Sequence, residues 1–141
     1  MKADHNDARR VVVTGIGVVT PIGQSVPEMW AGMREGRCGV SSLEGFPLDD
    51  LKILIAAQIK GFDPRARLRG FKRDKIVTLA DRYSWFAAAA ADETLRQSGV
   101  EIPMTNPYRS ACIIGSGAGG LTTYEMNYRS LVILTFGGGT N

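Results

Sequence analysis

The sequence predicts an α/β fold in which a mostly parallel sheet is flanked by helices. Residues 9–20, RRVVVTGIGVVT, form a near-continuous run of β-branched residues, which is typical of a strand covered on both faces. Two further apolar runs, residues 51–64 and 110–115, are separated by segments of helical periodicity. The resulting order of strand, helix, strand, helix, strand, glycine turn and helix is typical of parallel β-α units.

The first predicted helix occupies residues 25–36, SVPEMWAGMREG. Ser25 and Glu28 have the spacing of a capping box, and Pro27 falls in the first turn, where a helix tolerates it. Gly36 ends the helix, because glycine readily adopts the left-handed conformation found after a helix. One face of this helix is apolar and is formed by Met29, Trp30 and Met33.

The region between this helix and residue 64 is predicted to contain a loop and a strand. Residues 38–50 have a loop-like composition, and residues 51–64 form the second apolar run, closed by Gly61 and Pro64. This second strand belongs to the same predicted sheet.

A long helix is predicted from about Asp74 to Ser98, with Gly99 as its stop signal. Its alanine run, residues 87–91, predicts close approach to a neighbouring element. The apolar residues at helical spacing are Tyr83, Phe86, Ala87, Ala90, Thr94 and Leu95. The third apolar run then leads through a glycine turn into a last helix over residues 121–132.

Length and charge indicate one globular domain with a mild basic excess. The chain has 141 residues and a net charge of +3 at pH 7. Residues 65–75, RARLRGFKRDK, place six cations against one acid, Asp74. This segment predicts a solvated face and, as the alternative, a patch for an acidic partner. Only Phe71 could stack on bases there, so no nucleic-acid role is expected.

The cysteine count indicates a reducing compartment. Cys38 and Cys112 are too few for a disulfide framework and lack metal-ligand spacing, so we expect a cytoplasmic protein without a metal site. Residues 1–8 form a polar leader with acidic residues, which argues against a signal peptide. No apolar stretch approaches the ~18 residues of a membrane span.

The glycine turn contains the spacing G-x-G-x-x-G at Gly115, Gly117 and Gly120. After a strand and before a helix, this spacing allows backbone N–H groups to approach a phosphate. No acid follows Glu125, although a dinucleotide site needs one about 20 residues downstream to bind the ribose. A structural turn or a pocket wall is therefore favoured over a nucleotide site.

No catalytic nucleophile is predicted. Cys112 lies in an apolar run in which burial is expected to make the thiol inert, and Cys38 has Arg37 beside it but no base. The only histidine, His5, belongs to the polar leader.

Five motifs follow one another over about residues 9–132: RRVVVTGIGVVTPIG, MWAGMREGRCGV, AAQIKGFDP, ADRYSWFAAAAADETLRQSG and IGSGAGGL. Together they resemble the N-terminal part of β-ketoacyl-acyl-carrier-protein synthases, above all those of type II fatty acid synthesis and their nodulation-factor and polyketide relatives. The resemblance implies part of a thiolase-like fold, in which two α/β halves are fused, and a homodimer. It also implies an acyl-carrier protein as partner and no cofactor.

The resemblance further implies a decarboxylative condensation on a cysteine thiolate, assisted by two imidazoles and oxyanion-hole amides. The cysteine, histidine and lysine motifs that the family uses are not found in this sequence. We therefore assign no catalytic residue and expect the chain alone to have no condensing activity.

Two residues are candidates for an acyl-chain pocket by this resemblance. Ala118 occupies a slot of GSGAGG that in the family lies near the dimer interface and borders the acyl pocket; the alternative is that Ala118 simply packs in a turn. Phe136 begins FGGGTN, which resembles the family's glycine-rich gating loop except that Gly138 stands where an aromatic residue is usual. Residues 1–8, 9–132 and 133–141 are thus interpreted as leader, synthase-like region and glycine-rich tail.

Three functions remain in competition at the level of sequence. The first is a fragment or truncated form of a condensing enzyme. The second is a non-catalytic module that binds an intact ketosynthase or an acyl-carrier protein, and the third is a nucleotide-binding protein that uses the glycine turn.

Overall fold

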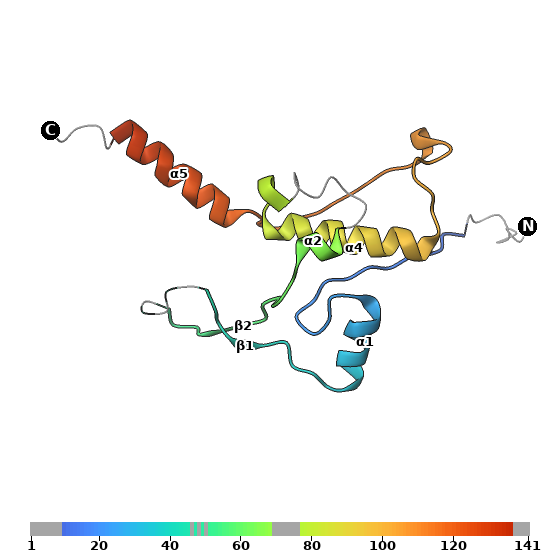
Figure 1. The fold of residues 1–141 in the computed structure, drawn as a ribbon, viewed down its shortest axis with the longest axis horizontal. Helices are drawn as coiled ribbons and strands as arrows, with labels where there is room; N and C mark the ends of the chain where they lie inside the picture. Colours follow the sequence, from blue (N-terminus) through green and yellow to red (C-terminus); the bar gives the residue numbers. More distant parts are fainter. Residues whose placement is uncertain (1–9, 46, 48, 50, 69–76, 137–141) are drawn as a thin grey trace, which may run out of the picture.

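The computed structural model describes residues 10–45, 47, 49, 51–68 and 77–136. A long helix lies at the centre, and the other elements are arranged around it (Figure 1). The elements are α1 (Val26–Arg34), β1 (Ser41–Ser42), β2 (Ile55–Ala56), α2 (Pro64–Arg67), the central α4 (Arg82–Ser98), the 3-10 helix η2 (Pro107–Arg109) and α5 (Leu121–Phe136). The leader, most of the basic segment and residues 137–141 lie outside the described residues.

Helix α1 confirms the first predicted helix and both of its end signals. The Ser25 hydroxyl accepts a hydrogen bond from the Glu28 N–H at 3.4 Å, and the Glu28 carboxylate accepts one from the Gln24 N–H at 2.8 Å. Gly36 has φ +66, and the Gly36 and Arg37 amides donate back to the Met33 and Gly32 carbonyls. This pair of hydrogen bonds is the Schellman motif, which the terminal glycine permits.

The mostly parallel sheet predicted from the sequence is wrong for the described residues. Their sheet has two strands, β1 and β2, which pair antiparallel with Ser41 opposite Ala56 and Ser42 opposite Ile55. Strand β1 falls in the predicted loop, and β2 covers only two residues of the strand expected over residues 51–64. Reciprocal hydrogen bonds between the Gln58 side chain and the Glu44 backbone, at 2.9 and 3.0 Å, extend this pairing.

The other two expected strands form no sheet, for a physical reason. A β-strand exists only where a neighbouring strand accepts and donates its backbone hydrogen bonds. Residues 10–19 and 110–115 lack such a neighbour within the described part of the chain and are assigned neither helix nor strand. Their apolar side chains are accordingly exposed: Val11 is 95% and Ile113 is 94% accessible.

Helix α4 begins later than the sequence indicates. The predicted helix began near Asp74, but Asp81 has ψ 162, an extended conformation, and α4 starts at Arg82. Residues 77–79 form a separate helical turn, so the predicted helix is broken at residues 80–81. Asp81 makes no side-chain capping hydrogen bond to α4. The predicted stop at Gly99 is confirmed, with φ +67.

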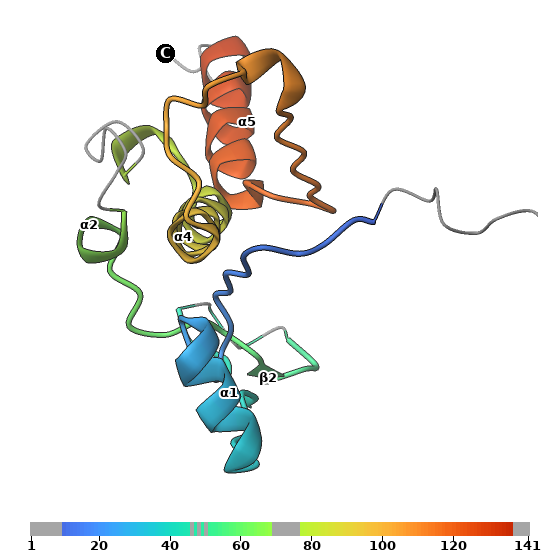
Figure 2. The same ribbon diagram turned by 90° about the vertical axis from the view of Figure 1, so that its right-hand side faces the viewer.

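The predicted close approach to the alanine run is confirmed. A Cβ built on Gly17 would lie 1.9 Å from the Ala90 carbonyl oxygen, and one on Gly15 would lie 2.3 Å from that of Thr94. Both distances are below any real carbon contact, so the backbone of residues 15–17 touches α4 directly. The N-terminal segment runs below α4 in Figure 1, and Figure 2, which looks nearly along the axis of α4, shows it passing next to the helix.

Two side chains of α4 bind this segment through its backbone. The Glu93 carboxylate accepts hydrogen bonds from the Val18 N–H at 3.0 Å and from the Val26 N–H at 2.8 Å. The Gln97 side-chain oxygen accepts one from the Ile16 N–H at 2.5 Å. Helix α4 thereby holds both the N-terminal segment and the start of α1.

A small core forms where α2 packs on α4. Leu68, which is fully buried, and Ala89, which is 3% accessible, are the buried apolar side chains of the described residues. Phe62 meets Phe86 edge-to-face at 5.0 Å between ring centroids. Helix α5 instead projects away from the other elements (Figure 1). Among the described residues, no helix has the length and apolar content needed to cross a membrane.

Candidate functional site

The glycine turn forms one wall of a cavity of about 310 Å³. Ala118 lies in this wall, and the N-terminal end of α4 supplies the facing residues, among them Tyr83. The full lining is Asp81, Arg82, Tyr83, Ala118, Gly119, Gly120, Leu121 and Thr122. The structure thus places Ala118 among the residues that line this cavity.

Asp81 connects the two sides of this cavity. Its carboxylate accepts a hydrogen bond of 2.5 Å from the Thr123 hydroxyl, in the first turn of α5. Gly120 precedes α5 with φ +73, and its carbonyl accepts from the Tyr124 N–H at 2.9 Å. The carboxylate also lies near the N-terminus of α5, where the helix dipole stabilises a negative charge.

The glycines of the turn serve two different purposes. A Cβ on Gly119 would lie 2.8 Å from three ring carbons of Tyr83, so the backbone rests directly on the aromatic ring. Gly115 and Gly117 have no atom within 4 Å of a built Cβ. Only the second half of G-x-G-x-x-G is therefore required for packing.

This geometry disfavours the nucleotide-binding alternative. A Cβ on Gly120 would lie 2.6 Å from an Asp81 carboxylate oxygen, so an acidic group already stands beside the helix N-terminus. A phosphate would need the same position and would be repelled by that charge.

The two predicted pocket residues are not brought together. Ala118 lies just before α5, and Phe136 is the last residue of that helix. A helix of 16 residues is about 24 Å long, so one side chain cannot gate the cavity that the other lines. Residues 133–136 continue α5, and the rest of the predicted tail lies outside the described residues.

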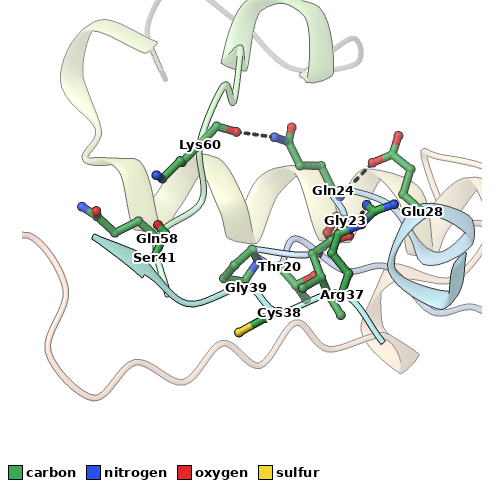
Figure 3. Close-up of a pocket in the computed structure, with 12 residues that line it drawn as sticks. Thr20, Gly23, Gln24, Glu28, Arg37, Cys38, Gly39, Ser41, Gln58 and Lys60 are labelled. Atoms are coloured by element: carbon green, nitrogen blue, oxygen red, sulfur yellow. Dashed lines mark hydrogen bonds between the residues drawn. The ribbon is translucent and has the colours of Figure 1, made fainter. Parts of the chain in front are cut away.

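A second cavity, of about 340 Å³, was missed by the sequence analysis (Figure 3). Three segments form it: the turn before α1, the segment after α1 and the segment after β2. Its lining consists of Thr20, Pro21, Ile22, Gly23, Gln24, Glu28, Arg37, Cys38, Gly39, Ser41, Gln58 and Lys60. The turn residues before the capping box indicated that the chain turns on one side of this cavity. Nothing in the sequence indicated that residues 58–60 would lie against this turn.

The cations of this second cavity already have partners. Arg37 donates to the Ile22 carbonyl at 3.1 Å and forms an ion pair with Glu35 at 2.6 Å. Lys60 pairs with Glu44 at 2.5 Å, and the Lys60 carbonyl accepts from the Gln24 side chain at 2.8 Å, the bond drawn at the top of Figure 3. These groups hold the three segments together and leave little charge for an anion.

The two cysteines are free and exposed. The expectation that Cys112 is buried in a strand is wrong, because the strand has no partner within the described residues. The Cys38 thiol contacts the Val40 carbonyl at 3.9 Å, and neither thiol has an imidazole beside it in the part of the chain that is described. His5 lies outside the described residues, which also contain no cluster of three metal-ligating side chains.

Comparison with known proteins gives one consistent result. Residues 8–136 match the family model described as "Beta-ketoacyl synthase, N-terminal domain". The chain is 37% identical over 126 residues to 3-oxoacyl-[acyl-carrier-protein] synthase 2 of Coxiella burnetii, covering 89% of this chain and 30% of the relative. It is 37% identical over 125 residues to nodulation protein E of Rhizobium sp. (strain N33), with 89% and 30% covered.

A polyketide beta-ketoacyl synthase of Streptomyces cyaneus is 42% identical over 120 residues, covering 85% of this chain and 28% of the relative. The chain thus spans about 30% of the length of the relatives that it matches. With its motifs in continuous order and the family model covering residues 8–136, the chain belongs to the beta-ketoacyl synthase family and corresponds to the N-terminal domain of that family.

Proposed function

We propose that this chain provides the N-terminal part of a condensing enzyme that joins an acyl thioester to a malonyl unit on acyl-carrier protein, with loss of carbon dioxide. The observation that carries this proposal is the family match over residues 8–136, together with relatives whose names include 3-oxoacyl-[acyl-carrier-protein] synthase. In this proposal the chain contributes to a thiolase-like fold and depends on further residues for the chemistry.

The chemistry explains why further residues are needed. A thioester condensation uses a thiolate nucleophile and hydrogen-bond donors that stabilise charge on the thioester oxygens. The chain contains one histidine, and its two thiols lie on extended or loop segments rather than at a helix N-terminus. We therefore expect neither acyl transfer nor decarboxylation from this chain alone.

Ala118 is the part of the chain that we place against the acyl tail. Its methyl group takes little room in the cavity of about 310 Å³, and the apolar surface that Tyr83 and Leu121 contribute to the lining favours an apolar ligand. Phe136 is a second contact only if the acyl tail passes along α5, since the helix separates the two residues.

The partners follow from the same proposal. The basic segment, residues 65–75, offers a complementary charge to an acidic partner, and an acidic acyl-carrier protein is the partner that we propose. A homodimer or a pairing with an intact ketosynthase would cover apolar side chains such as Leu134, which is 82% accessible. Free thiols suit the reducing cytoplasm.

A chimera tests the proposal. Residues 8–136 would replace the matched stretch of the Coxiella burnetii relative, and the purified chimera would be assayed for release of labelled carbon dioxide from malonyl-loaded carrier and for elongation of the acyl chain. We expect the chimera to elongate and the chain alone to be inactive in the same assay.

Two outcomes contradict the proposal. One is a folded chimera, with the melting transition of the parent enzyme, that performs no condensation. The other is condensation by the chain alone. The unmodified relative, assayed in parallel, is the control for the substrates.

A second candidate is favoured by the exposed apolar surface. A non-catalytic module would bind an intact ketosynthase or a carrier protein without taking part in the reaction. Titration of the chain against an intact ketosynthase and against a carrier protein, in parallel with the activity assay of the chimera, separates the two candidate functions. A non-catalytic module would bind one of these proteins although the chimera is inactive.

A further inference from the structure

Tyr83, in the first turn of α4, supports the glycine turn with its aromatic ring. A Cβ built on Gly119 would lie 2.8 Å from three carbons of the ring, and one built on Gly120 would lie 3.5 Å from a fourth. The ring therefore spans the backbone of two successive residues. The turn lies at the N-terminal end of α4, where α5 also starts (Figure 1). Because 46% of Tyr83 remains accessible, part of the ring is free to contact a bound molecule.

This tyrosine also lines the cavity of about 310 Å³, which we call the Ala118 cavity. Together with Ala118 and Leu121, it gives the cavity a mostly apolar lining. The charged residues of the lining already have partners. Arg82 donates to a backbone carbonyl at 2.8 Å, and the Asp81 carboxylate accepts from a hydroxyl at 2.5 Å. The Ala118 cavity thus suits an apolar, uncharged part of a ligand.

The glycine turn does not depend on Tyr83 alone. Its last residue, Gly120, accepts a hydrogen bond from the Tyr124 N–H at 2.9 Å, and the hydrogen bond between Asp81 and Thr123 ties the start of α5 to the residue before α4. Both bonds remain when the ring is removed. The surroundings of a deleted side chain relax only in part, so loss of the ring leaves space. This space would be continuous with the cavity, because the ring belongs to its lining.

We propose that Tyr83 is a specificity-determining residue that limits the length of the acyl tail accepted by the Ala118 cavity. This role rests on the proposed function, which supplies the kind of ligand, and adds to it the residue that stops the tail. A cavity of about 310 Å³ is near the lower end of the range for ligand pockets, about 300–1,000 Å³, so a stop at its wall excludes long tails. Ala118 leaves room for the tail, and the ring of Tyr83 ends that room.

Binding of fatty acids to the full chain tests this role. Dissociation constants of a radiolabelled series of saturated acids, from hexanoate to palmitate, would be measured by equilibrium dialysis. The wild-type chain would be compared with Tyr83→Ala, which removes the ring, and with Tyr83→Phe, which keeps it. Tyr108→Ala is the matched control, because this tyrosine lies in η2 and is 97% accessible, so its loss removes no packed side chain.

For the wild-type chain, we expect the affinity to rise about fourfold with each methylene that becomes buried and to stop rising at a limiting length. In Tyr83→Ala the rise should continue for about two more methylenes, so the longer acid gains about tenfold in affinity over the wild type. Tyr83→Phe and Tyr108→Ala should keep the wild-type limit. Ala118→Leu should shorten it, and combining Ala118→Leu with Tyr83→Ala should return the limit close to that of the wild type.

The same limiting length in the wild type and Tyr83→Ala, an equal extension in Tyr108→Ala, a wild-type affinity that rises through palmitate without a limit, or no binding of any acid would each overturn the inference. If Tyr83→Ala loses helical circular dichroism signal, Tyr83→Leu, which keeps a smaller apolar side chain, takes its place. An unchanged limit in Tyr83→Leu is then equally decisive.

The chimera keeps these results distinct from the proposed function. An active chimera, together with an unchanged limit in Tyr83→Ala, rejects the role of Tyr83 and retains the function. An inactive chimera, together with a longer limit in Tyr83→Ala, rejects the function and retains the binding site for the tail.

Discussion

At the scale of single residues, the two glycines of TGIG are required by their contact with α4. Gly15 and Gly17 leave no room for a methyl group, because carbonyl oxygens of the helix occupy the place of the Cβ. The structure thus gives a packing reason for glycine at both positions. The alanine run of α4 was the sequence signal that could have indicated contact between these glycines and the helix.

Replacing Gly17 with alanine is expected to detach the N-terminal segment from α4. The new Cβ would overlap the Ala90 carbonyl oxygen at 1.9 Å, and an overlap of this kind costs about 1–3 kcal/mol. Faster amide exchange at Ile16 and Val18 would report the detachment. Gly117→Ala, where a built Cβ meets nothing within 4 Å, is the matched control, and equal exchange in the two variants would refute the packing role.

Glu93 is a second residue with a defined structural role, because its carboxylate accepts hydrogen bonds from two backbone N–H groups. Glu93→Gln keeps one acceptor oxygen and should leave the Val18 or the Val26 amide unpaired. We expect a loss of about 1–3 kcal/mol in the free energy of opening at these amides, measured by hydrogen exchange.

Glu125→Gln is the control for this change of charge. It removes only an exposed ion pair with Arg129, which is worth at most about 0.5 kcal/mol. Indistinguishable exchange in the Glu93 and Glu125 variants would mean that the two hydrogen bonds do not hold the segment.

At the scale of elements, both ends of α1 and the C-terminal end of α4 were predictable, whereas the start of α4 and the strands were not. The capping box of α1 and the terminal glycines Gly36 and Gly99 are local signals, and all of them are confirmed. A strand depends on a partner, and residues 10–19 and 110–115 have none among the described residues. The start of α4 was missed because Asp81 is extended although the periodicity continues through it.

The attachment of α5 to α4 depends on the hydrogen bond between Asp81 and Thr123. Thr123→Val keeps the shape of the side chain and removes the hydroxyl donor, so the first turn of α5 should open more often. We expect faster exchange of the Tyr124 amide, by about fivefold for the loss of a hydrogen bond of about 1 kcal/mol. Thr122→Val is the neighbouring control, and the same increase there would show that the hydroxyl of Thr123 has no special role.

The candidate cavity was predictable only in part. The resemblance pointed to Ala118, and the structure places this residue in a cavity wall. Tyr83 was predicted as an apolar position of the helix, but its place under Gly119 could not be derived, because it depends on the path of the chain between residues 99 and 120. The cavity of Figure 3 depends in the same way on contacts between distant segments.

At the scale of the whole molecule, the chain exposes more surface than its mass accounts for. Its accessible surface is 12374 Å², whereas a compact monomer of 15.2 kDa exposes about 7,100 Å². The excess includes apolar residues at strand-like and helical positions, such as Val11, Ile113 and Leu134. Helix α5 also exposes large apolar side chains, such as Leu121, Leu131 and Leu134, beside its exposed Glu125–Arg129 ion pair.

Small-angle X-ray scattering of the freshly eluted chain, with the particle mass taken from the same profile, tests this account most directly. A compact monomer of 141 residues has a radius of gyration of about 14 Å. We predict either a monomer that is clearly larger than this or a particle of at least twice the chain mass. A 15.2 kDa particle with a radius of gyration near 14 Å would contradict the claim that this domain leaves its apolar surfaces for another polypeptide to cover.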